Sequence, residues 1–376
     1  MTAAISREER LDWLQLIRTE SIGPISFFRL LKKFGSAAAA LDALPRLARA
    51  AGRAQPPALA DRETCARELD LADELGVRII LACEPDYPRL LRPLPDRPPV
   101  LYAKGHPSLF ERPAVAIIGA RNASGAGRKI ARDLAQGLGA EGVVVVSGLA
   151  RGIDGTAHAA AIETGTIAVV AGGVDVIYPP EHEDLTLEIA ARGLLVCERA
   201  LGHQPTARDF PRRNRLISGL ARGVVVVEAA AKSGTLITAR FALDQGREVF
   251  AVPGSPLDPR CQGANRLIRD GATLVETAED ILEVLAAQAR GARETGPDDL
   301  FDWAEGAGET DEAPDAAPPE LRAAVFELLS FTPLHRDEIL RAAGAPPGLV
   351  ADALLELVLA GEAEELPGGA FVRAAR

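Results

Sequence analysis

The stretch AVAIIGARNASGAGRKIAR, residues 114–132, decides the fold. A short apolar run, Val115–Ile118, is followed by Gly119 and then by a segment with the periodicity of an amphipathic helix. This pattern predicts a strand, a tight turn and a helix, whose first backbone N–H groups and dipole would attract an anion. Arg121 lies in the turn, where we expect it to flank that anion. Taken alone, the stretch also fits an ordinary strand–helix turn with a solvated arginine.

The same alternation of strand and helix continues through the middle of the chain. Most of the predicted strands are continuous β-branched runs, which are typical of strands buried on both faces. They cover residues 115–118, 143–146, 167–170, 194–197, 224–227, 249–252 and 273–275, with helices between them and a last helix at 278–290. Seven strands in alternation with helices predict an α/β domain with a doubly wound, mostly parallel sheet.

The chain of 376 residues is too long for one ordinary core. We expect an all-helical domain at 1–76, whose first two helices are separated at Ile22-Gly23-Pro24. The α/β domain follows at 77–290, opening with a strand at 77–81 and a proline-dense lead-in. Residues 291–320 are rich in Pro, Gly, Asp and Glu and predict a linker. Residues 321–376 predict three helices and a hairpin, the layout of a winged helix.

The sequence allows more than one role for the N-terminal and the C-terminal domain. The glycine turn of the N-terminal helices could contact a DNA backbone, or the helices could be a packing module. The third helix of the predicted winged helix carries Asp352 and Glu356 and no Lys or Arg. A helix that reads DNA would normally be basic, so we expect this domain to contact protein or to be structural.

The composition argues against several classes of protein. Residues 291–376 hold 6 basic and 18 acidic side chains, so the net charge of −11 comes from the C-terminal region and the rest of the chain is nearly balanced. The 4 cysteines are widely spaced, without CxxC pairs or metal-ligand spacing, and predict neither disulfides nor a metal site. An apolar signal segment and a long apolar run are both missing from the sequence, so we expect a cytoplasmic protein with no membrane insertion.

The candidate binding residues follow the predicted strands, because ligands of open α/β sheets bind outside the carboxyl ends of the strands. They are Gly119, Arg121, Ser147, Gly148, Arg151, Gly172, Phe210, Arg212, Arg213, Asn214, Arg215, Lys232, Ser233, Gly234 and Thr235. Glycine permits close approach of a phosphate, and arginine binds phosphate through parallel hydrogen bonds. We expect Arg121 and Arg213 in loops, and Ser233 and Thr235 to cap the following helix. Several such turns at one edge favour a polyanion.

Two of these residues have alternative roles. Phe210 stands among arginines and could stack on an unpaired base, or it could be a core residue that orients its loop. Asn214 could pair with a base edge or brace a neighbouring loop.

Enzymatic signals are weak. The first turn lacks GxGxxG, and Ser147-Gly148 stands where a ribose-binding carboxylate belongs, so NAD binding is disfavoured. A Walker motif is also missing. His158 is expected to be a packing residue, and Asp154 and Asp175 are expected to brace loops rather than to form an acid–base pair.

The loops contain eight motifs in order: IGAR (118–121), SGLARGID (147–154), AGGVDVIYP (171–179), FPRRNRLISGL (210–220), VVVEA (225–229), SGTLITA (233–239), VPG (252–254) and GANRLI (263–268). Together these motifs resemble the DprA (Smf) family of DNA-processing proteins. The N-terminal unit is similar to the family's SAM-like or helix-hairpin-like domain, and the C-terminal unit to its winged helix.

The resemblance implies an extended Rossmann-like domain that forms a homodimer and binds single-stranded DNA without sequence preference. It further implies protection of that DNA and loading of RecA onto it in natural transformation, with no catalytic residue and no cofactor. The family's G-S/T-R loop corresponds to Gly119-Ala120-Arg121, where Ala120 replaces the hydroxyl residue. The basic FPxRNR segment corresponds to residues 210–215.

Two other functions remain open. A nucleotide phosphoribohydrolase similar to the LOG ("lysine decarboxylase-like") family would carry a glutamate shortly after its glycine motif, whereas this chain has Ile237 and Thr238 there. A protein-interaction scaffold would suit the acidic C-terminal region.

Overall fold

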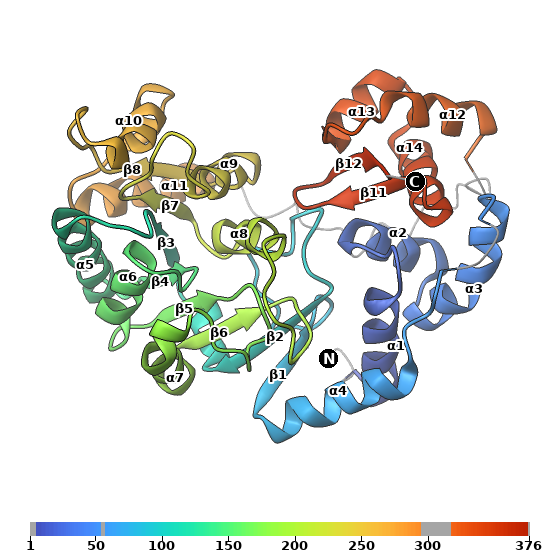
Figure 1. The fold of residues 1–376 in the computed structure, drawn as a ribbon, viewed down its shortest axis with the longest axis horizontal. Coiled ribbons are helices and arrows are strands. Elements are labelled where there is room, and N and C mark those ends of the chain that lie inside the picture. The colour runs from blue at the N-terminus through green and yellow to red at the C-terminus, as the bar shows by residue number, and fades with distance from the viewer. Residues whose placement is uncertain (1–4, 54–56, 295–316, 375–376) are drawn as a thin grey trace.

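The computed structural model describes residues 5–53, 57–294 and 317–374. Figure 1 shows the α/β domain on one side, and the N-terminal helices and the C-terminal domain together on the other. The N-terminal helices are α1 (Arg7–Arg18), α2 (Pro24–Phe34), α3 (Ala37–Ala50) and α4 (Arg62–Glu74). The alanine-rich α3 was not predicted. It contains Pro45, which is unfavourable inside a helix, but Leu41 and Leu44 anchor it in the core of the domain.

The sheet contains all seven predicted strands of the alternating region and two more at its edge. In chain order the strands are β1 (Val77–Leu81), β2 (Val100–Gly105), β3 (Ala114–Ile118), β4 (Val144–Ser147), β5 (Thr166–Val169), β6 (Leu194–Cys197), β7 (Gly223–Val226), β8 (Glu248–Ala251) and β9 (Thr273–Leu274). Their spatial order is β1-β2-β6-β5-β4-β3-β7-β8-β9. Among the described strands of this sheet, the β1–β2 and β2–β6 pairs are antiparallel and the other pairs are parallel. The proline-dense lead-in concealed β2 in the sequence.

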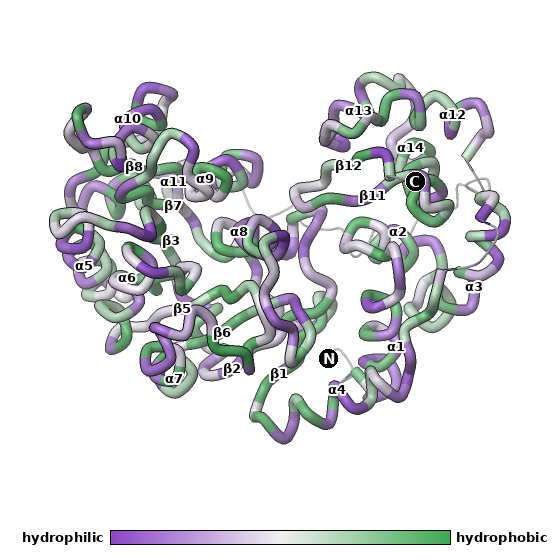
Figure 2. Tube along the Cα trace, in the orientation of Figure 1, coloured by the Kyte–Doolittle hydropathy of each residue, from purple (hydrophilic) through white to green (hydrophobic). Residues whose placement is uncertain are grey.

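Helices cover both faces of the sheet, as the doubly wound prediction requires. One face packs on α5 (Gly125–Ala140), α6 (Ile153–Ala161) and α11 (Ala278–Glu294). The other packs on α8 (Asp209–Gly219), α9 (Thr235–Asp244) and α10 (Gln262–Arg269), while α7 (Glu183–Arg192) contacts β6 and β2. The strands form an apolar band in Figure 2. Burial of each large side chain there contributes roughly 1.5–3 kcal/mol.

The winding direction reverses at β3. From β3 the chain builds β4, β5 and β6 on one side and β7, β8 and β9 on the other, so β3 and β7 are neighbours. The connections that leave the carboxyl ends of these two strands diverge to opposite faces of the sheet. Such a switch point opens a crevice where open α/β sheets bind ligands.

The C-terminal domain is a winged helix. It comprises α12 (Pro319–Leu328), β10 (Leu334–His335), α13 (Arg336–Ala343), α14 (Pro347–Ala360), β11 (Ala363–Leu366) and β12 (Ala370–Arg373), with the strand order β10-β12-β11. The two-residue strand β10 was too short to predict from the sequence. Residues 295–316, most of the predicted linker, lie outside the described residues.

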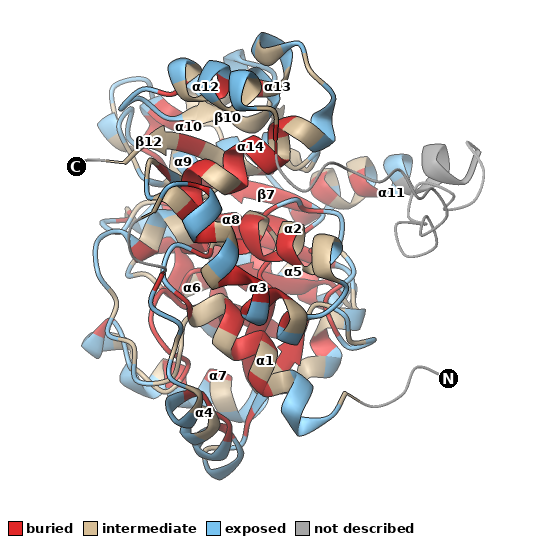
Figure 3. Cartoon of the chain, turned by 90° about the vertical axis from the view of Figure 1, so that its right-hand side faces the viewer, coloured by how far each residue is buried: buried red, intermediate tan, exposed pale blue. Residues whose placement is uncertain are grey.

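The third helix of this domain, α14, packs on the N-terminal helices α2 and α3 (Figures 1 and 3). Leu355 and Leu359 belong to the same apolar core as the N-terminal helices, and Asp352 forms an ion pair with Arg29 at 2.6 Å. This internal interface explains why α14 carries no Lys or Arg. Its place fits the structural alternative of the expectation, and contact with a partner protein stays a prediction.

The wing hairpin completes the same interface. The Glu365 carboxylate accepts hydrogen bonds from the backbone N–H groups of Ile25 and Ser26 at 2.8 and 3.0 Å, and from the Ser26 hydroxyl at 2.8 Å. Helix α2 has only Gly23 at its N-cap, without a side-chain cap of its own. A carboxylate from the opposite end of the chain therefore caps α2.

No described helix is by itself long and apolar enough to cross a membrane; α13 and α14 meet that standard only as a pair, with a bend of 117°.

Candidate nucleic-acid interface

A cleft of about 230 Å³ lies at the carboxyl edge of the sheet, beside the β3 end of the switch point. It collects side chains and turns from the connections that follow β3, β4 and β5 and from α8. Six of the fifteen predicted residues line it, namely Arg121, Gly148, Arg151, Gly172, Phe210 and Arg213. The fold therefore gathers at one place residues that are separated by up to 92 positions.

An exposed arginine and two aromatic rings form the open side of this cleft. The guanidinium carbon of Arg121 lies 5.4 Å from the ring centroid of Phe210. The Phe210 ring lies 5.5 Å from that of Tyr178, with an interplanar angle of 55°. Phe210 is only partly buried, so it is a cleft residue and not a core residue. Sequence reasoning missed Tyr178, although the scarcity of aromatic residues and its place in AGGVDVIYP were available signals.

Arg213 lies beneath the cleft as a buried brace. Its side chain is 6% exposed, and Nη1 donates hydrogen bonds to the carbonyl oxygen of Gly148, at 2.7 Å, and to that of Val169. Burial, with a smaller effect of Arg121, lowers the pKa of Arg213 to about 10, and Asp154 partly opposes this. The expectation that Arg213 lies in a loop is wrong, because α8 begins at Asp209 and includes the whole FPRRNR segment.

The start of α8 is fixed by Asp209. Its carboxylate accepts hydrogen bonds from the backbone N–H and hydroxyl of Thr206, at 2.8 and 2.7 Å, and from Nε2 of His203 at 2.9 Å, and it pairs with Arg199. Burial raises the pKa of Asp209, but the hydrogen bonds from His203 and Thr206 and the charge of Arg199 outweigh it and hold this pKa well below its usual range. This network fixes the first turn of α8, the helix that carries Phe210 and Arg213.

The remaining polar residues of the FPRRNR segment lie away from the cleft. The buried Glu198 carboxylate accepts a hydrogen bond from Nε of Arg212 at 3.0 Å and pairs with Arg215. Arg215 is 1% exposed, and it also donates to the backbone oxygen of Asp96 at 2.7 Å. Asn214 accepts a hydrogen bond of 3.4 Å from Arg213 and does not line the cleft, so here it braces its neighbour.

The turn after β4 is held by buried groups. The Ser147 hydroxyl, fully buried, donates to the Ile117 carbonyl at 2.6 Å and so ties β4 to β3. Asp154 accepts from the N–H groups of Gly148 and Ala150, at 3.1 and 3.4 Å, which is the loop-bracing role predicted for it. A Cβ atom on Gly148 would lie 2.8 Å from Arg213 Nη2. Glycine is required there because protein groups approach closely.

The turn after β3 is packed in the same way. A Cβ atom on Gly119 would lie 2.6 Å from the side chain of Ile153. Gly119 is therefore fixed by packing against α6, and it does not line the cleft.

The turn after β7 reaches the β3 turn without lining the cleft. Lys232 and Gly234 are exposed, and the Thr235 hydroxyl donates to the Gly119 carbonyl at 3.2 Å. The residue at the N-cap of α9 is Gly234, and no side chain caps that helix. The prediction that Ser233 and Thr235 cap it is wrong. Ser233 Oγ accepts from the Thr235 N–H at 3.2 Å and donates to the Thr235 hydroxyl at 3.0 Å, and that hydroxyl donates to the β3 turn.

The predicted anion site at the start of α5 holds a carboxylate of the protein itself. Ser124 caps α5, and Glu228, at the end of β7, accepts from the N–H and hydroxyl of Ser124 at 3.0 and 2.5 Å. The expectation that this helix end is free for a ligand anion is therefore wrong. The exposed cation in this turn is Arg121.

The cleft offers few side chains for acid–base catalysis or metal binding. Within the described part of the chain, no group of three His, Cys, Asp or Glu side chains could hold a metal ion. The cleft lining contains one carboxylate, Glu181, which is ion-paired with Arg151 at 3.4 Å. At the positions where a phosphoribohydrolase would carry its glutamate, Ile237 is exposed on α9 and Thr238 is buried.

Fold and site together define a three-domain protein of Rossmann type, with a basic and aromatic cleft at the sheet edge. The family model of DNA recombination-mediator protein A matches residues 78–286. A DprA-like N-terminal HHH domain matches residues 7–70, and a DprA winged helix domain matches residues 309–369. The chain belongs to the DprA (Smf) family.

Relatives and solved structures agree with this family. Protein Smf of Synechocystis sp. is 32% identical, over 98% of this chain and 100% of that protein. Protein Smf of Escherichia coli is 41% identical, over 77% of this chain and 75% of that protein. The structure of DprA from Streptococcus pneumoniae has a TM-score of 0.61 and 33% identity, and covers 75% of this chain and 98% of that one. That of DprA from Helicobacter pylori, described in terms of its single-stranded DNA binding mode, has a TM-score of 0.53 and 30% identity, and covers 57% and 97%.

Proposed function

We propose that the cleft at the sheet edge binds single-stranded DNA without sequence preference. The observation that carries this proposal is the placement of the exposed Arg121 guanidinium beside the Phe210 and Tyr178 rings. Arginine supplies a charge-assisted contact to phosphate, and aromatic rings stack on any unpaired base. The single-stranded DNA binding mode described for the Helicobacter pylori protein, of which this chain covers 97%, supports the assignment.

We propose that Arg121, Arg151, Phe210 and Tyr178 contact DNA, and that Arg213, Gly148 and Gly172 shape the cleft. Arg212 and Arg215 are ion-paired to Glu198, so they act on the strand only by fixing α8. Duplex DNA is disfavoured, because stacking at the rings needs an unpaired base and because α14 is buried against α2 and α3. In this proposal the chain is a binding protein, not an enzyme, and needs no cofactor.

The wider role follows from the family. We propose that the chain protects incoming single strands and loads RecA onto them in natural transformation. We also propose that it forms a homodimer through the α/β domain. The terminal strand β9 is paired on one side only and its Leu274 is 48% exposed, which leaves a free strand edge with an apolar side chain for a second copy.

The experiment that tests the proposed function compares single strands with blunt duplex of the same sequence by fluorescence anisotropy. Single strands should bind more tightly, with little dependence on sequence. If about 3–5 phosphates are neutralised, log K should fall against log[salt] with a slope of about −2 to −3.5. Equal or tighter binding to duplex would overturn the proposal, and an affinity that salt does not change would indicate a small-molecule site.

Loading of RecA has its own test. A loader has to share one strand with RecA, whereas a coating protein competes with it. We expect a crosslinked complex of the chain, RecA and one oligonucleotide, and a shorter lag in RecA's DNA-dependent ATPase on strands coated with single-strand-binding protein. A longer lag, or failure to detect the complex, would leave protection of single strands as the better account.

A further inference from the structure

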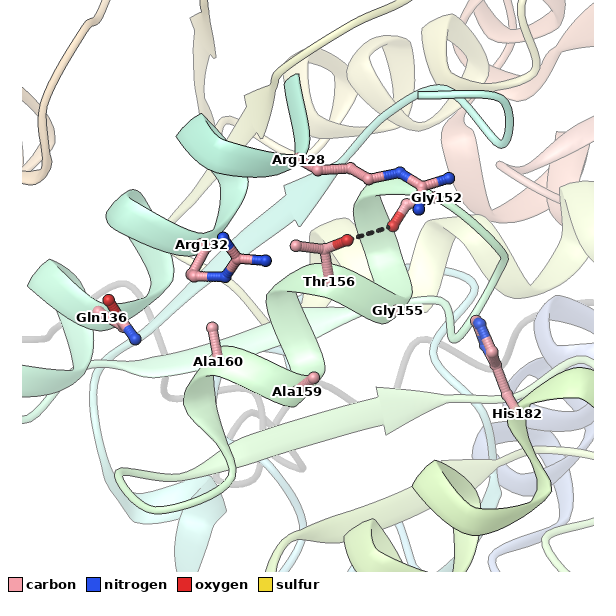
Figure 4. Close-up of a pocket in the computed structure, with 9 residues that line it drawn as sticks. All are labelled: Arg128, Arg132, Gln136, Gly152, Gly155, Thr156, Ala159, Ala160 and His182. Carbon is pink, nitrogen blue, oxygen red and sulfur yellow. Dashed lines mark hydrogen bonds between the residues drawn. The ribbon is translucent and has the colours of Figure 1, made fainter. Parts of the chain in front are cut away.

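A second pocket, of about 390 Å³, lies between α5 and α6 (Figure 4). Helix α6 forms its floor with small residues, including Gly155, Ala159 and Ala160. A Cβ atom on Gly155 would lie 2.5 Å from Cε1 of His182, so this ring closes one end of the pocket. The Thr156 hydroxyl on the floor donates to the Gly152 carbonyl at 2.9 Å.

The wall of the pocket is cationic. Arg128 and Arg132 come from successive turns of α5, four residues apart, and so lie on one face of that helix. Figure 4 shows both guanidinium groups extended from α5 toward α6. Both side chains are exposed, and neither forms an ion pair or hydrogen bond within the described residues. On the adjacent stripe of the same helix Lys129 is paired with Asp133 at 2.5 Å. The unpaired cations of α5 are therefore the two that face the pocket.

The same two chain segments line both the cleft and the pocket. The turn after β4 lines the cleft with residues 148–151 and the pocket with Gly152. The segment after β5 lines the cleft with residues 178–181 and the pocket with His182. The ring of His182 is held to the first of these segments by a hydrogen bond of 3.1 Å between its Nδ1 and the Leu149 carbonyl. Arg151 and Glu181 stand at the boundary between the two sites.

The turn at this boundary is held in an unusual conformation. Leu149 has a φ of 56° and Gly152 a φ of 82°. A Cβ atom on Gly152 would lie 2.2 Å from the carbonyl oxygen of Ala120, so the backbone of this turn touches the loop that carries Arg121. Positive φ at a buried leucine costs on the order of 1–3 kcal/mol and persists where the surroundings fix it. The turn therefore separates the cleft from the pocket and lies in close contact with the loop of Arg121.

We infer that the pocket between α5 and α6 is a second phosphate-binding subsite, in which Arg128 and Arg132 contact phosphates of the strand that leaves the cleft past Arg151. The inference rests on the proposed function, because the cleft must first hold the strand. It names the chemistry of the occupant as a phosphodiester. Thr156 and the small floor residues leave room for an anion against the helix.

The test uses the full chain and fluorescent oligothymidylates of increasing length. Replacement of both arginines, Arg128→Gln with Arg132→Gln, should weaken binding of long oligonucleotides on the order of tenfold at low salt. The salt slope should become shallower by about 1.4, which corresponds to two phosphate contacts. The shortest oligonucleotide, which occupies only the cleft, should bind the variant as it binds the parent chain. The matched control, Lys129→Gln with Arg240→Gln, removes two exposed charges outside the pocket and should change neither quantity.

The outcomes separate the two proposals. Unchanged binding of long strands to the double variant, or an equal loss for short and long strands, overturns the subsite. Inorganic phosphate serves as a second probe: if the double variant loses only competition by phosphate and keeps its affinity for long strands, the pocket holds a free anion and the inference fails. Arg121→Ala is measured in parallel. If that variant also binds strands normally, the proposed function itself is at fault.

Discussion

Arg213 donates a hydrogen bond of 2.7 Å from Nη1 to the carbonyl oxygen of Gly148, and this contact joins α8 to the turn after β4. The same Nη1 reaches the carbonyl oxygen of Val169 at the end of β5. One buried guanidinium thus holds the floor of the cleft together, while Arg121 stands exposed at its opening. The two arginines have different physical roles, and substitution separates them.

The first prediction contrasts Arg121→Ala with Arg213→Ala. Arg121→Ala should weaken single-strand binding by about 1–3 kcal/mol, because it removes a charge-assisted contact, and should change the free energy of unfolding by less than about 0.5 kcal/mol. Arg213→Ala should lower the free energy of unfolding by about 1–3 kcal/mol, because two buried carbonyl oxygens lose their donor. Strand titration and thermal melting of both variants are the measurements. An unchanged melting temperature for Arg213→Ala would refute the bracing role.

Arg121 and Arg213 show which features of the site could be predicted from the sequence and which could not. Strands buried on both faces have a strong local signal, so the alternating strands and the doubly wound sheet could be predicted, whereas the strand order and its switch point were not. The signal does not reveal on which side of α8 a given arginine points, because Arg212, Arg213 and Arg215 occupy one short segment and differ only in helical phase. That phase depends on where α8 begins, and Asp209 at its first turn is held by Arg199, His203 and Thr206 from the preceding segment.

Long-range partners also explain the other departures. The start of α5 has the local pattern of an anion site, but Glu228, 104 residues away from Ser124, occupies it. The residues around Ser124 give no indication that Glu228 is its partner. The pocket on the far side of the β4 turn was missed for a similar reason. Arg128 and Arg132 can be recognised as pocket residues only when the fold places α6 beside α5.

The second prediction concerns Phe210. Phe210→Ala should weaken single-strand binding by about 1–3 kcal/mol for every sequence tested, because stacking does not distinguish bases. Phe210→Leu keeps an apolar side chain and loses the ring, so it should show most of the same loss. A double-mutant cycle with Arg121→Ala should show a coupling of about 0.5–1 kcal/mol from the cation–ring contact. If Phe210→Leu binds like the parent chain, the ring does not stack on DNA.

The third prediction concerns the wing. Glu365→Ala removes the cap of α2 and leaves the N–H groups of Ile25 and Ser26 without their acceptor, so the free energy of unfolding should fall by about 1–3 kcal/mol. Glu364→Ala, at the exposed neighbouring position, is the matched control and should stay within about 0.5 kcal/mol. Denaturant titration of both variants measures the difference. Equal effects of the two substitutions would show that the wing does not stabilise the N-terminal helices.

The fourth prediction concerns His158, a fully buried residue of α6. The Thr166 hydroxyl donates its proton to the Val145 carbonyl at 2.9 Å, so it must accept from Nδ1–H of His158 at 2.7 Å. Nε2 then carries no proton, and it has no partner among the described residues. Burial, with the charges of His182 and Arg213, lowers the pKa of His158 to about 3.

The sign of the resulting pH dependence follows from where the proton binds. In the unfolded chain a histidine becomes protonated below about pH 6.5, whereas in the folded chain His158 stays neutral until the pH falls to about 3. The stabilisation is therefore complete above about pH 6.5 and declines as the pH falls, by at most about 1.4 kcal/mol per unit. His158→Gln should flatten the dependence of unfolding free energy on pH between about 6.5 and 5, above the range where carboxylates titrate. A slope that survives in His158→Gln would assign the pH dependence to other groups.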